Sequence, residues 1–372
     1  MSFMSSTWGK HIQLSLFGES HGEGIGIVID GLPAGLEIDF DKVDLEMRRR
    51  APGHNPLGTL RKESDDYSIL SGYFNQHTTG TPLTVLIKNK ETASKDYSQM
   101  QTLMRPGHGD YSGYMKYGGY NDYRGGGHFS GRLTAPIVFA GAVCRQILER
   151  RQIYIHGEIN QIRNLKSAGI RIENLDEKNR QAIKSLKFPS LDEAFALEAS
   201  QVIMDAKAEK DSVGGKIELV VLNMPAGVGG PFFDSLESVL AHLIFSIPGV
   251  KGLAFGDGFG FASALGSEVK DEYGVKEGRV VGYANHNGGI TGGISNGNVI
   301  RFEVAMKPTP SIGKPQRTID MDQQIETTLE IEGRHDPCIL PRALPVIEAM
   351  TAIALYELIC EEERSHENLG GK

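Results

Sequence analysis

Glycine, histidine, arginine and aspartate occur together in three short runs of this chain. The runs are GESHG at residues 18–22, RPGHGD at residues 105–110 and GRHDPC at residues 333–338. Glycines allow the backbone to come close to a ligand, because they have no side chain and adopt conformations that other residues avoid. The imidazole, guanidinium and carboxylate groups beside them are suited to proton transfer and anion binding. The runs therefore predict loops that hold reactive groups around a bound molecule.

The size and the cysteines of the chain set its broad class. Its 372 residues are enough for one large domain or two, with an apolar core of its own. The three cysteines are far apart and lack the short paired spacings of zinc sites and redox pairs, so we expect a reduced, cytoplasmic protein. Residues 1–10 do not resemble an export signal, and the longest apolar stretch that we recognise, residues 133–144, is too short to cross a bilayer. We therefore expect a soluble protein without membrane contact.

The charge balance argues against nucleic acid as a partner and favours a small anionic ligand. The formal net charge of −8 disfavours a basic face of the kind that phosphate backbones require. Cationic residues nevertheless crowd the first third of the chain, at Arg48, Arg49, Arg50, Arg61, Lys62, Arg105, Arg124 and Arg132. Cationic side chains beside glycines in an acidic protein indicate a cleft for a small anion. For residues 48–50 the alternative is the end of a helix, where positive charge complements the helix dipole.

Composition and periodicity predict a mixture of strands and helices. Strands rich in β-branched and aliphatic residues are predicted for residues 24–30, 81–88, 216–223 and 299–306. Helices are predicted between residues 39 and 51, with Asp39 or Asp41 as the cap, and over residues 133–151, 234–247 and 342–363. Residues 105–131 hold too many glycines and tyrosines for a regular element, which predicts a long, ordered, functional loop. Residues 174–211 are polar with helical spacing, and we expect a solvent-facing excursion there.

The order of these elements indicates an α+β fold. Strands and helices do not alternate regularly, which disfavours a doubly wound sheet and an eight-fold barrel. In each half a glycine-rich strand leads to an amphipathic helix, and a glycine-rich loop then leads to a long apolar helix. An internal pseudo-two-fold repeat is therefore a hypothesis. The helix predicted from residue 133 is apolar on all sides, which implies a central helical layer.

Three side chains are candidates for catalysis. His21 and His108 are candidate proton carriers, because histidine exchanges protons near neutral pH without a large change of its pKa. Asp336, which follows Arg334 and His335 and is restrained by Pro337, is the best candidate for a functional carboxylate. The alternatives are a structural role for each histidine and capping of the last helix for Asp336.

Two glycine-rich segments are suited to binding anions. Residues 124–132 (RGGGHFSGR) lead directly into the apolar helix, so their backbone N–H groups, with Ser130 and Arg132, would suit a phosphate. Residues 288–297, followed by KPTPS at residues 307–311, offer a second set of hydroxyls, amides and one ammonium. Two such segments predict two phosphorylated ligands, although a tight packing turn is the alternative for the first. Residues 22–26 are not a dinucleotide-binding motif, because they precede a strand instead of following one.

These runs resemble those of the chorismate synthase family. The similarity extends from residue 18 to about residue 350, and its motifs occur in the family's order at residues 18–33, 79–82, 105–110, 124–132, 285–295, 307–311 and 333–338. The resemblance implies a lyase that eliminates phosphate from 5-enolpyruvylshikimate 3-phosphate, by a trans-1,4 route, to give chorismate. It also implies dependence on reduced FMN without net oxidation, one domain over residues 1–372, a β-α-β sandwich of antiparallel sheets around a helical layer, and a homotetramer.

The resemblance also implies roles for individual residues. His108 would protonate the reduced flavin, His21 would protonate or retain the departing phosphate, and Asp336 would help the flavin to act as the base. Arg49, Arg105, Arg132 and Arg334 would hold anionic groups of substrate and cofactor, Arg49 and Arg105 on the substrate side. The residues that fall where the family binds FMN are Ser130, Arg132, Gly292, Lys307, Thr309, Ser311 and Arg334.

The chain departs from the family pattern at three places. His128, Phe129, Ser130 and Gly131 stand where the family commonly has Arg-Ser-Ser-Ala, which puts one cationic cofactor contact in doubt. Residues 51–56 lack a second basic residue that many relatives carry, and Arg61 is a candidate substitute. Pro248 and Gly249 replace the more frequent Asn-Ala at a flavin-contact turn.

Two other functions fit the sequence less well. A flavin-binding reductase that uses NADPH is disfavoured, because the dinucleotide motif is absent from the sequence. A phosphometabolite-binding protein without activity is disfavoured by His21, His108 and Asp336, since a binding protein has no need of proton carriers.

Overall fold

The computed structural model describes residues 6–53, 55, 57–58, 64–90, 101–331 and 336–368. Two antiparallel sheets of five strands each form its frame. The first sheet has the order β1-β2-β3-β7-β4 and consists of β1 (Thr7–Trp8), β2 (Gln13–Gly18), β3 (Gly24–Asp30), β7 (Leu83–Lys88) and β4 (Tyr67–Ser71). The second has the order β11-β16-β10-β8-β9 and consists of β11 (Val250–Phe255), β16 (Ile300–Met306), β10 (Gly215–Leu222), β8 (Tyr154–Ile162) and β9 (Leu165–Lys166).

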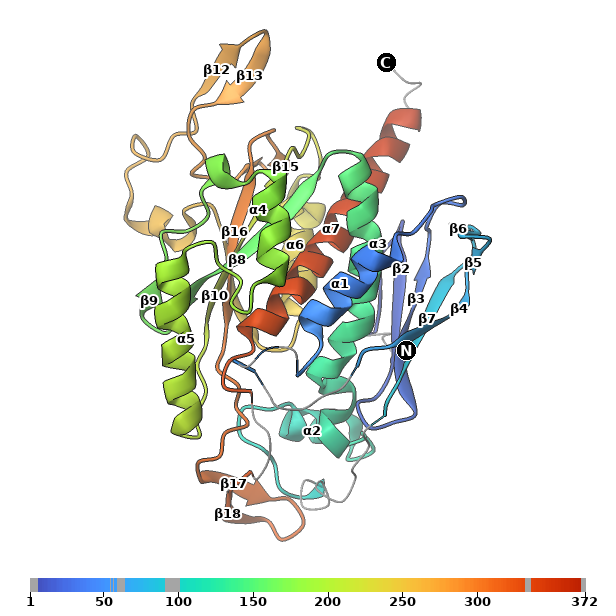
Figure 1. Ribbon diagram of the computed structural model, residues 1–372, viewed down its shortest axis with the longest axis vertical. Helices are drawn as coiled ribbons and strands as arrows, with labels where there is room; N and C mark the ends of the chain where they lie inside the picture. The colour runs from blue at the N-terminus through green and yellow to red at the C-terminus, as the bar shows by residue number, and fades with distance from the viewer. Residues whose placement is uncertain are drawn as a thin grey trace.

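Helices lie between the two sheets (Figure 1). Helix α3 (Thr134–Arg150) packs on β3 and β7 of the first sheet and on β8 of the second, whereas α7 (Leu340–Asn368) packs on β8 and β10. The two helices also pack on each other and on α1 (Phe40–Arg50), and α6 (Leu236–Phe245) packs on α7 and β11. Gly141 permits the close approach of α3 and α7, because a Cβ there would lie 2.3 Å from Cβ of Ala349. The expected central helical layer is therefore present.

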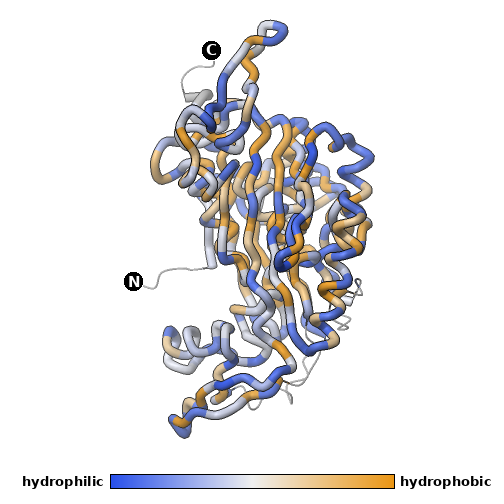
Figure 2. The backbone as a smooth tube through the Cα atoms, turned by 90° about the vertical axis from the view of Figure 1, so that its left-hand side faces the viewer, coloured by the Kyte–Doolittle hydropathy of each residue, from blue (hydrophilic) through white to orange (hydrophobic). Residues whose placement is uncertain are grey.

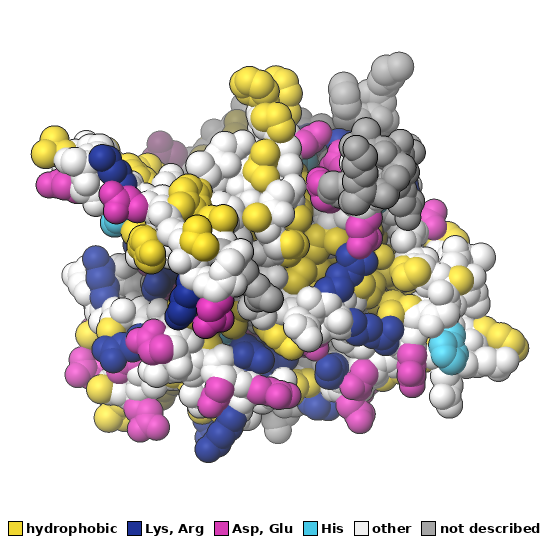
Figure 3. Space-filling view, turned by 90° about the horizontal axis from the view of Figure 1, so that it is seen from above, with side chains coloured by type: hydrophobic (Ala, Val, Ile, Leu, Met, Phe, Trp, Pro, Cys, Tyr) yellow, Lys and Arg dark blue, Asp and Glu magenta, His cyan; other side chains and the backbone are white. Residues whose placement is uncertain are grey.

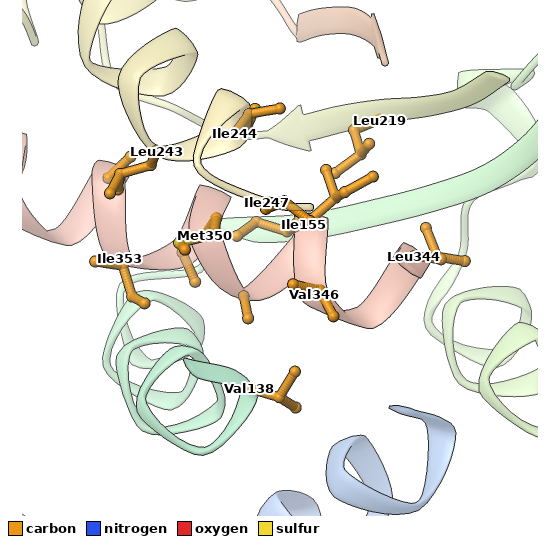
Figure 4. Packing of buried hydrophobic residues seen from close by; sticks show 14 of the residues in the cluster. Val138, Ile155, Leu219, Leu243, Ile244, Ile247, Leu344, Val346, Met350 and Ile353 are labelled. Carbon is orange, nitrogen blue, oxygen red and sulfur yellow. The ribbon is translucent and has the colours of Figure 1, made fainter. Parts of the chain in front are cut away.

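Apolar side chains from both helices and the second sheet form the core between the layers. Figure 4 shows α7, with Met350 and Ile353, lying between α3 with Val138 and the second sheet with Ile155 and Leu219. In Figure 2 the apolar backbone segments run through the middle of the molecule, and hydrophilic segments form many of its loops and projecting ends. Side chains of both charges are scattered over the face seen from above in Figure 3, among many apolar ones.

Helix α7 is the longest helix of the described chain and contains a long apolar stretch. Its stretch Leu340–Ser365 is long and apolar enough to cross a membrane, but 94% of its most apolar window is buried inside the protein. Such burial is typical of a core helix. This stretch is longer than residues 133–144, so the prediction that residues 133–144 are the longest apolar run is wrong.

The remaining elements lie around this frame. Helices α4 (Glu177–Ala182) and α5 (Glu193–Ala208) form the expected excursion, although Phe195, Ala199 and Ile203 of α5 are buried. The small hairpins are β5–β6 (Tyr73–Phe74, His77–Thr78), β12–β13 (Tyr273–Lys276, Arg279–Gly282), β14–β15 (Ile290–Thr291, Ile294–Ser295) and β17–β18 (Gln316–Asp320, Ile325–Leu329). Short 3-10 turns complete the chain at η2 (Arg124–Phe129), η3 (Gly131–Leu133), η4 (Ile172–Asn174), η5 (Ile183–Ser185), η6 (Phe232–Asp234) and η7 (Gly258–Ser263).

Several predictions of local structure are confirmed. The four predicted strands correspond to β3, β7, β10 and β16, and the four predicted helices to α1, α3, α6 and α7. Asp39 is the N-cap of α1, because its side chain accepts a hydrogen bond from the N–H of Lys42. The prediction that residues 105–131 contain no regular element is wrong, because α2 (Asp110–Tyr117) forms there and ends at Gly118 in the left-handed conformation. The internal repeat stays a hypothesis.

Candidate active site

Two cavities that share a wall collect most of the predicted site residues. The first has a volume of about 290 Å³, and we call it the cationic cavity because Arg50, Arg132 and Arg342 line it together with Asp336. The second has a volume of about 550 Å³, and we call it the glycine groove. Its glycine lining consists of Gly107, Gly109, Gly125, Gly126, Gly131 and Gly249, and Arg105, His108, Ser130, Lys307 and Thr309 also line it. Both cavities are lined by Ser130, Gly131, Ile247, Pro248 and Ile339.

Segments far apart in the sequence converge on these cavities. Arg50 is the last residue of α1, Arg132 lies in η3 just before α3, and Arg342 lies in the first turn of α7. Lys307 and Thr309 directly follow β16, the second strand of the second sheet. The cavities therefore lie where the ends of three central helices meet the end of a strand.

Ion pairs fix the guanidinium groups of the cationic cavity. The buried carboxylate of Asp65 pairs with Nη1 of Arg50 and, at 3.0 Å, with Nη1 of Arg132. Nε of Arg132 also donates to the side-chain oxygen of Asn89 at 2.6 Å. Nη1 of Arg342 donates to Asp336 at 2.5 Å, and its Nε donates to the backbone oxygen of Arg50 at 3.0 Å.

The cationic cavity has an excess of positive charge. Three guanidinium groups face two carboxylates, those of Asp65 and Asp336. Burial lowers the pKa of Arg342, and the charge of Arg50 adds to this effect while Asp336 opposes it. Crowded, desolvated cations of this kind favour the binding of an anion that supplies planar oxygens for bidentate contacts.

His108 lies in the glycine groove beside Arg105 and Ser311. Its Nε2 is 2.7 Å from the hydroxyl oxygen of Ser311, within hydrogen-bonding distance. Arg105 donates twice to the carboxylate of Asp110, from Nε at 2.7 Å and from Nη2 at 2.8 Å. Burial, together with the positive charges of Arg105 and Lys307, lowers the pKa of His108 to about 4, against an opposing effect of Asp110. The imidazole is therefore neutral at pH 7 when no ligand is bound.

The groove is also lined by the ammonium of Lys307 and the hydroxyl groups of Ser130 and Thr309. Lys307 donates to the backbone oxygen of Gly107, and burial lowers its pKa. The hydroxyl oxygen of Ser130 accepts a hydrogen bond from the N–H of Arg132 at 3.3 Å. Within the described part of the chain, the buried hydroxyl of Thr309 has no hydrogen-bond partner. Because buried polar groups are nearly always satisfied, this hydroxyl indicates a ligand atom in the groove.

His21 lies directly behind the groove. It is buried, and its Nδ1 is 3.2 Å from the hydroxyl oxygen of Ser20. Gly125 separates its ring from the groove, since a Cβ at Gly125 would lie 2.1 Å from Cε1 of His21. Only glycine permits this approach, and its φ of +57° is also in the left-handed region.

The residues that depart from the family pattern anchor this loop. Nδ1 of His128 donates to the backbone oxygen of Gly18 at 2.8 Å, and Nε2 lies 2.9 Å from the hydroxyl oxygen of Ser6. Phe129 packs over Gly109 and Gly113 of the α2 segment. His128 thus contributes to holding the glycine loop against the end of β2.

Arg49 lines neither cavity, and its assignment to the substrate stays a prediction. Its side chain is buried with Glu46 and Glu348, in a network that Arg145 and Lys184 complete. Although burial opposes ionisation, Arg49, Arg145 and Lys184 together hold the pKa of Glu46 far below its usual range. Successive residues of a helix point in directions about 100° apart, so Arg50, one position later, reaches the cationic cavity instead.

Gly292 is a further predicted residue that lines neither cavity. Gly292 lies in the β14–β15 turn, where the neighbouring Gly293 accepts a hydrogen bond from the N–H of Leu236 at the start of α6. The groove is lined by Phe245 and Ser246 at the other end of this helix, which is about 15 Å away for ten residues at the usual helical rise. Arg334 lies outside the described residues.

Sequence reasoning missed four residues of the site, namely Arg50, Asp65, Asn89 and Arg342. Arg50 belongs to a run that was recognised, but the run does not reveal which arginine faces the ligand. Arg342 was recognised only as the start of the last helix, although a lone guanidinium in the first turn of an apolar helix is unusual. Asp65 and Asn89 lie in segments that carry no local signal.

Comparison with known proteins identifies related chains over nearly the whole length. The family model described as chorismate synthase matches residues 12–360. A chorismate synthase of Dehalococcoides mccartyi is 44% identical over 355 residues, which are 95% of this chain and 96% of the relative. One of Thermococcus gammatolerans is 44% identical over 350 residues, covering 94% and 96%. A crystal structure of chorismate synthase superposes with a TM-score of 0.71 at 28% identity, covering 98% of this chain and 94% of the other.

Proposed function

The chain belongs to the chorismate synthase family, and on that premise we propose that the cationic cavity holds the substrate and the glycine groove the cofactor. The reaction is the elimination of phosphate from 5-enolpyruvylshikimate 3-phosphate to give chorismate, in the biosynthesis of aromatic amino acids. The family uses reduced FMN. The positions of both ligands and the roles of the residues are our proposal.

The three guanidinium groups of the cationic cavity carry this proposal. The substrate has a phosphate and two carboxylates, and each offers oxygens in the geometry that arginine binds in bidentate fashion. Arg50, Arg132 and Arg342 are held by Asp65 and Asp336 before any ligand arrives. Groups that are already oriented lose little conformational entropy on binding, which favours tight and specific binding of an anion.

The residues that line the glycine groove are suited to binding FMN. Its walls combine apolar side chains, Phe129, Phe245, Ile247, Pro248 and Ile339, with the polar groups of Ser130, Lys307 and Thr309. The unpartnered hydroxyl of Thr309 and the ammonium of Lys307 would hold the phosphate or ribityl oxygens. When bound, reduced FMN supplies the electron-rich group that loss of an unactivated hydrogen requires, a role for which ordinary side chains are too weak.

His108 and His21 would be the proton carriers of the reaction. His108 is neutral without ligands, because its pKa is about 4. An anion beside it offsets the charges of Arg105 and Lys307 and raises this pKa, so the imidazole takes up a proton as the ligands bind. For His21, which lies behind Gly125 of the glycine groove, we keep the role that the resemblance implies, protonation or retention of the departing phosphate. Asp336 would orient Arg342 at the cationic cavity.

Further parts of the proposal concern the whole assembly. We infer one domain over residues 1–372, a homotetramer and a cytoplasmic location, as the resemblance implies. Gly292 and Arg334 remain proposed FMN contacts. Because Gly292 lies at the far end of α6 in this chain, the β14–β15 turn of a neighbouring copy would be the one to supply it.

Anaerobic release of inorganic phosphate from 5-enolpyruvylshikimate 3-phosphate tests the proposal. We expect phosphate and chorismate only when chemically reduced FMN is present, and a loss of about 100-fold in kcat for His108→Ala, the usual scale for removing a proton carrier. Release that does not depend on reduced FMN, or an unchanged rate in the variant, would refute the assigned roles.

A further inference from the structure

We propose that Asp65 is a positioning residue that sets Arg50 and Arg132 for the substrate; this inference rests on the substrate site proposed above. Asp65 lies just before β4, in a segment without regular structure. Its side chain is 1% exposed, and each carboxylate oxygen takes a different guanidinium. Oδ2 pairs with Nη1 of Arg50, and Oδ1 pairs with Nη1 of Arg132 at 3.0 Å.

The two arginines come from separate elements, and Asp65 joins them. Arg50 ends α1, and Arg132 lies in η3 before α3, 82 positions later in the chain. Nε of Arg50 also donates to Thr134 at 3.2 Å, and Nε of Arg132 donates to Asn89 at 2.6 Å. Each guanidinium is thus oriented from two sides. In both cases Asp65 provides the charged contact, which is the stronger kind.

Asp65 could act by reducing the positive charge of the cavity or by positioning the two arginines. These two roles predict opposite effects on anion binding when the carboxylate is removed, so an experiment can distinguish them. If the carboxylate only reduced the positive charge of the cavity, its removal would tighten the binding of an anion. If it positions the arginines, its removal weakens binding, because an amide presents a single acceptor oxygen and turns its NH2 group toward the other guanidinium.

The adjacent residue provides a matched control. Asp66 has a side chain that is 66% exposed and pairs with Lys90 at the surface. Exposed ion pairs of this kind contribute little to the stability of a protein. Asp66→Asn therefore makes the same chemical change one position away, without touching either arginine.

The test measures the dissociation constant of 5-enolpyruvylshikimate 3-phosphate by calorimetry, with oxidised FMN so that no turnover occurs, and the KM and kcat with reduced FMN. We expect Asp65→Asn to raise the dissociation constant and the KM about 10-fold, as for a lost charge-assisted contact, with a smaller change in kcat. Asp65→Glu keeps the charge but moves the carboxylate, and we expect an increase of about 3-fold on the same grounds. Asp66→Asn should bind like the unaltered chain.

The outcomes separate this inference from the proposed function. Unchanged or tighter binding in Asp65→Asn, with the melting temperature retained, would overturn the positioning role. If Asp65→Asn does not fold, Asp65→Glu decides, because unchanged binding there contradicts positioning. Arg50→Gln tests the site itself: if this variant also binds normally, the substrate lies elsewhere and the proposed function of the cavity fails. If Arg50→Gln binds the substrate more weakly but Asp65→Asn binds it normally, only the positioning role of Asp65 is rejected.

Discussion

Nε2 of His108 lies 2.7 Å from the hydroxyl oxygen of Ser311, although the two residues are 203 positions apart in the chain. The contact joins the RPGHGD run to the segment that follows β16, and residues of both segments line the glycine groove. A hydroxyl at one ring nitrogen fixes the orientation of an imidazole. Ser311 was predicted to contact FMN, and the structure gives its hydroxyl a partner within the protein. The protonation state of His108 is therefore central to the site.

The first prediction concerns stability at low pH. The pKa of His108 is about 4 in the folded protein and about 6.5 in an unfolded chain. Between these values the unfolded chain binds a proton that the folded protein does not, so His108 reduces stability as the pH falls from about 6.5 to about 4. We expect His108→Gln to lose less melting temperature than the unaltered chain when the pH is lowered from 7 to about 4.5.

Nuclear magnetic resonance of labelled histidine gives the direct measurement. The signal that disappears in His108→Gln should titrate near pH 4 without ligands, and at a higher pH when FMN and substrate are bound, because anions favour the imidazolium. A signal that titrates near 6.5 without ligands would contradict the burial that the structure shows. Equal acid sensitivity of both proteins would do so as well.

The second prediction uses three adjacent arginines with different surroundings. Arg49 is buried with Glu46 and Glu348, whereas Arg48 is exposed and Arg50 lines the cationic cavity. Removing one partner of a buried network leaves uncompensated charge, so Arg49→Met should lower the free energy of unfolding by about 3–5 kcal/mol. Its KM for the substrate should change little at a temperature where the protein is folded.

Denaturant unfolding and steady-state kinetics on all three variants provide the comparison. Arg48→Met should alter neither quantity, and Arg50→Gln should raise the KM about 10-fold or more, as for loss of a charge-assisted contact. A large increase of KM in Arg49→Met with normal stability would support the assignment of Arg49 to the substrate.

These arginines show where sequence reasoning is effective and where it ends. The composition of residues 48–50 predicted an anion contact, but the choice among three neighbours depends on the rotation of α1 against α7, which is set by packing. The role of Asp65 is even harder to predict from the sequence, because its two partners come from other elements and no local pattern marks it. Pairings between distant segments depend on the tertiary fold, and a single sequence does not display them.

Local patterns were sufficient for most core elements. The β-branched composition of β3 and β16 and the capping side chain of Asp39 are properties of neighbouring residues, and these predictions are confirmed. Helix α2 was missed because glycine and tyrosine lower helix propensity. Gly113 is nevertheless buried against Phe129, so tertiary contact outweighs propensity there. The glycine runs correctly indicated close approaches, as at Gly125, but not which side chain would be approached.

The third prediction concerns the unpartnered hydroxyl of Thr309. A buried hydroxyl without a partner costs stability, so Thr309→Val should leave the unfolding free energy of the ligand-free protein unchanged or raise it by up to about 1 kcal/mol. The same change should weaken FMN binding about 5-fold, the worth of one hydrogen bond. Chemical denaturation and fluorescence titration with FMN measure the two effects.

A satisfied hydroxyl serves as the control. Thr351 in α7 is fully buried and donates to the backbone oxygen of Ile347 at 2.8 Å. Thr351→Val should lower stability by about 1 kcal/mol and leave FMN affinity unchanged. If both valine variants lose stability equally, the hydroxyl of Thr309 has a partner in the protein and does not indicate a ligand.

The last prediction concerns two glycines of the same loop. A Cβ at Gly125 would lie 2.1 Å from Cε1 and 2.2 Å from Nδ1 of His21, and the φ of +57° disfavours any other residue. At Gly131 a Cβ would meet nothing within 4 Å, and the φ is not in the left-handed region. Gly125→Ala should displace His21 and lower kcat about 100-fold, as expected for a misplaced proton carrier.

Gly131→Ala makes the same chemical change six positions later and introduces the residue that the family commonly has there. Although Gly131 lines both cavities, the variant should retain normal kcat and a normal melting temperature, because the new methyl group meets no atom of the protein and alanine is the residue that the family pattern has at this position. Steady-state kinetics under anaerobic conditions, with the melting temperature of each variant, compare the two. Equal kcat in both variants would mean that the position of His21 behind Gly125 is not required for turnover, and the proton would then have to come from another group.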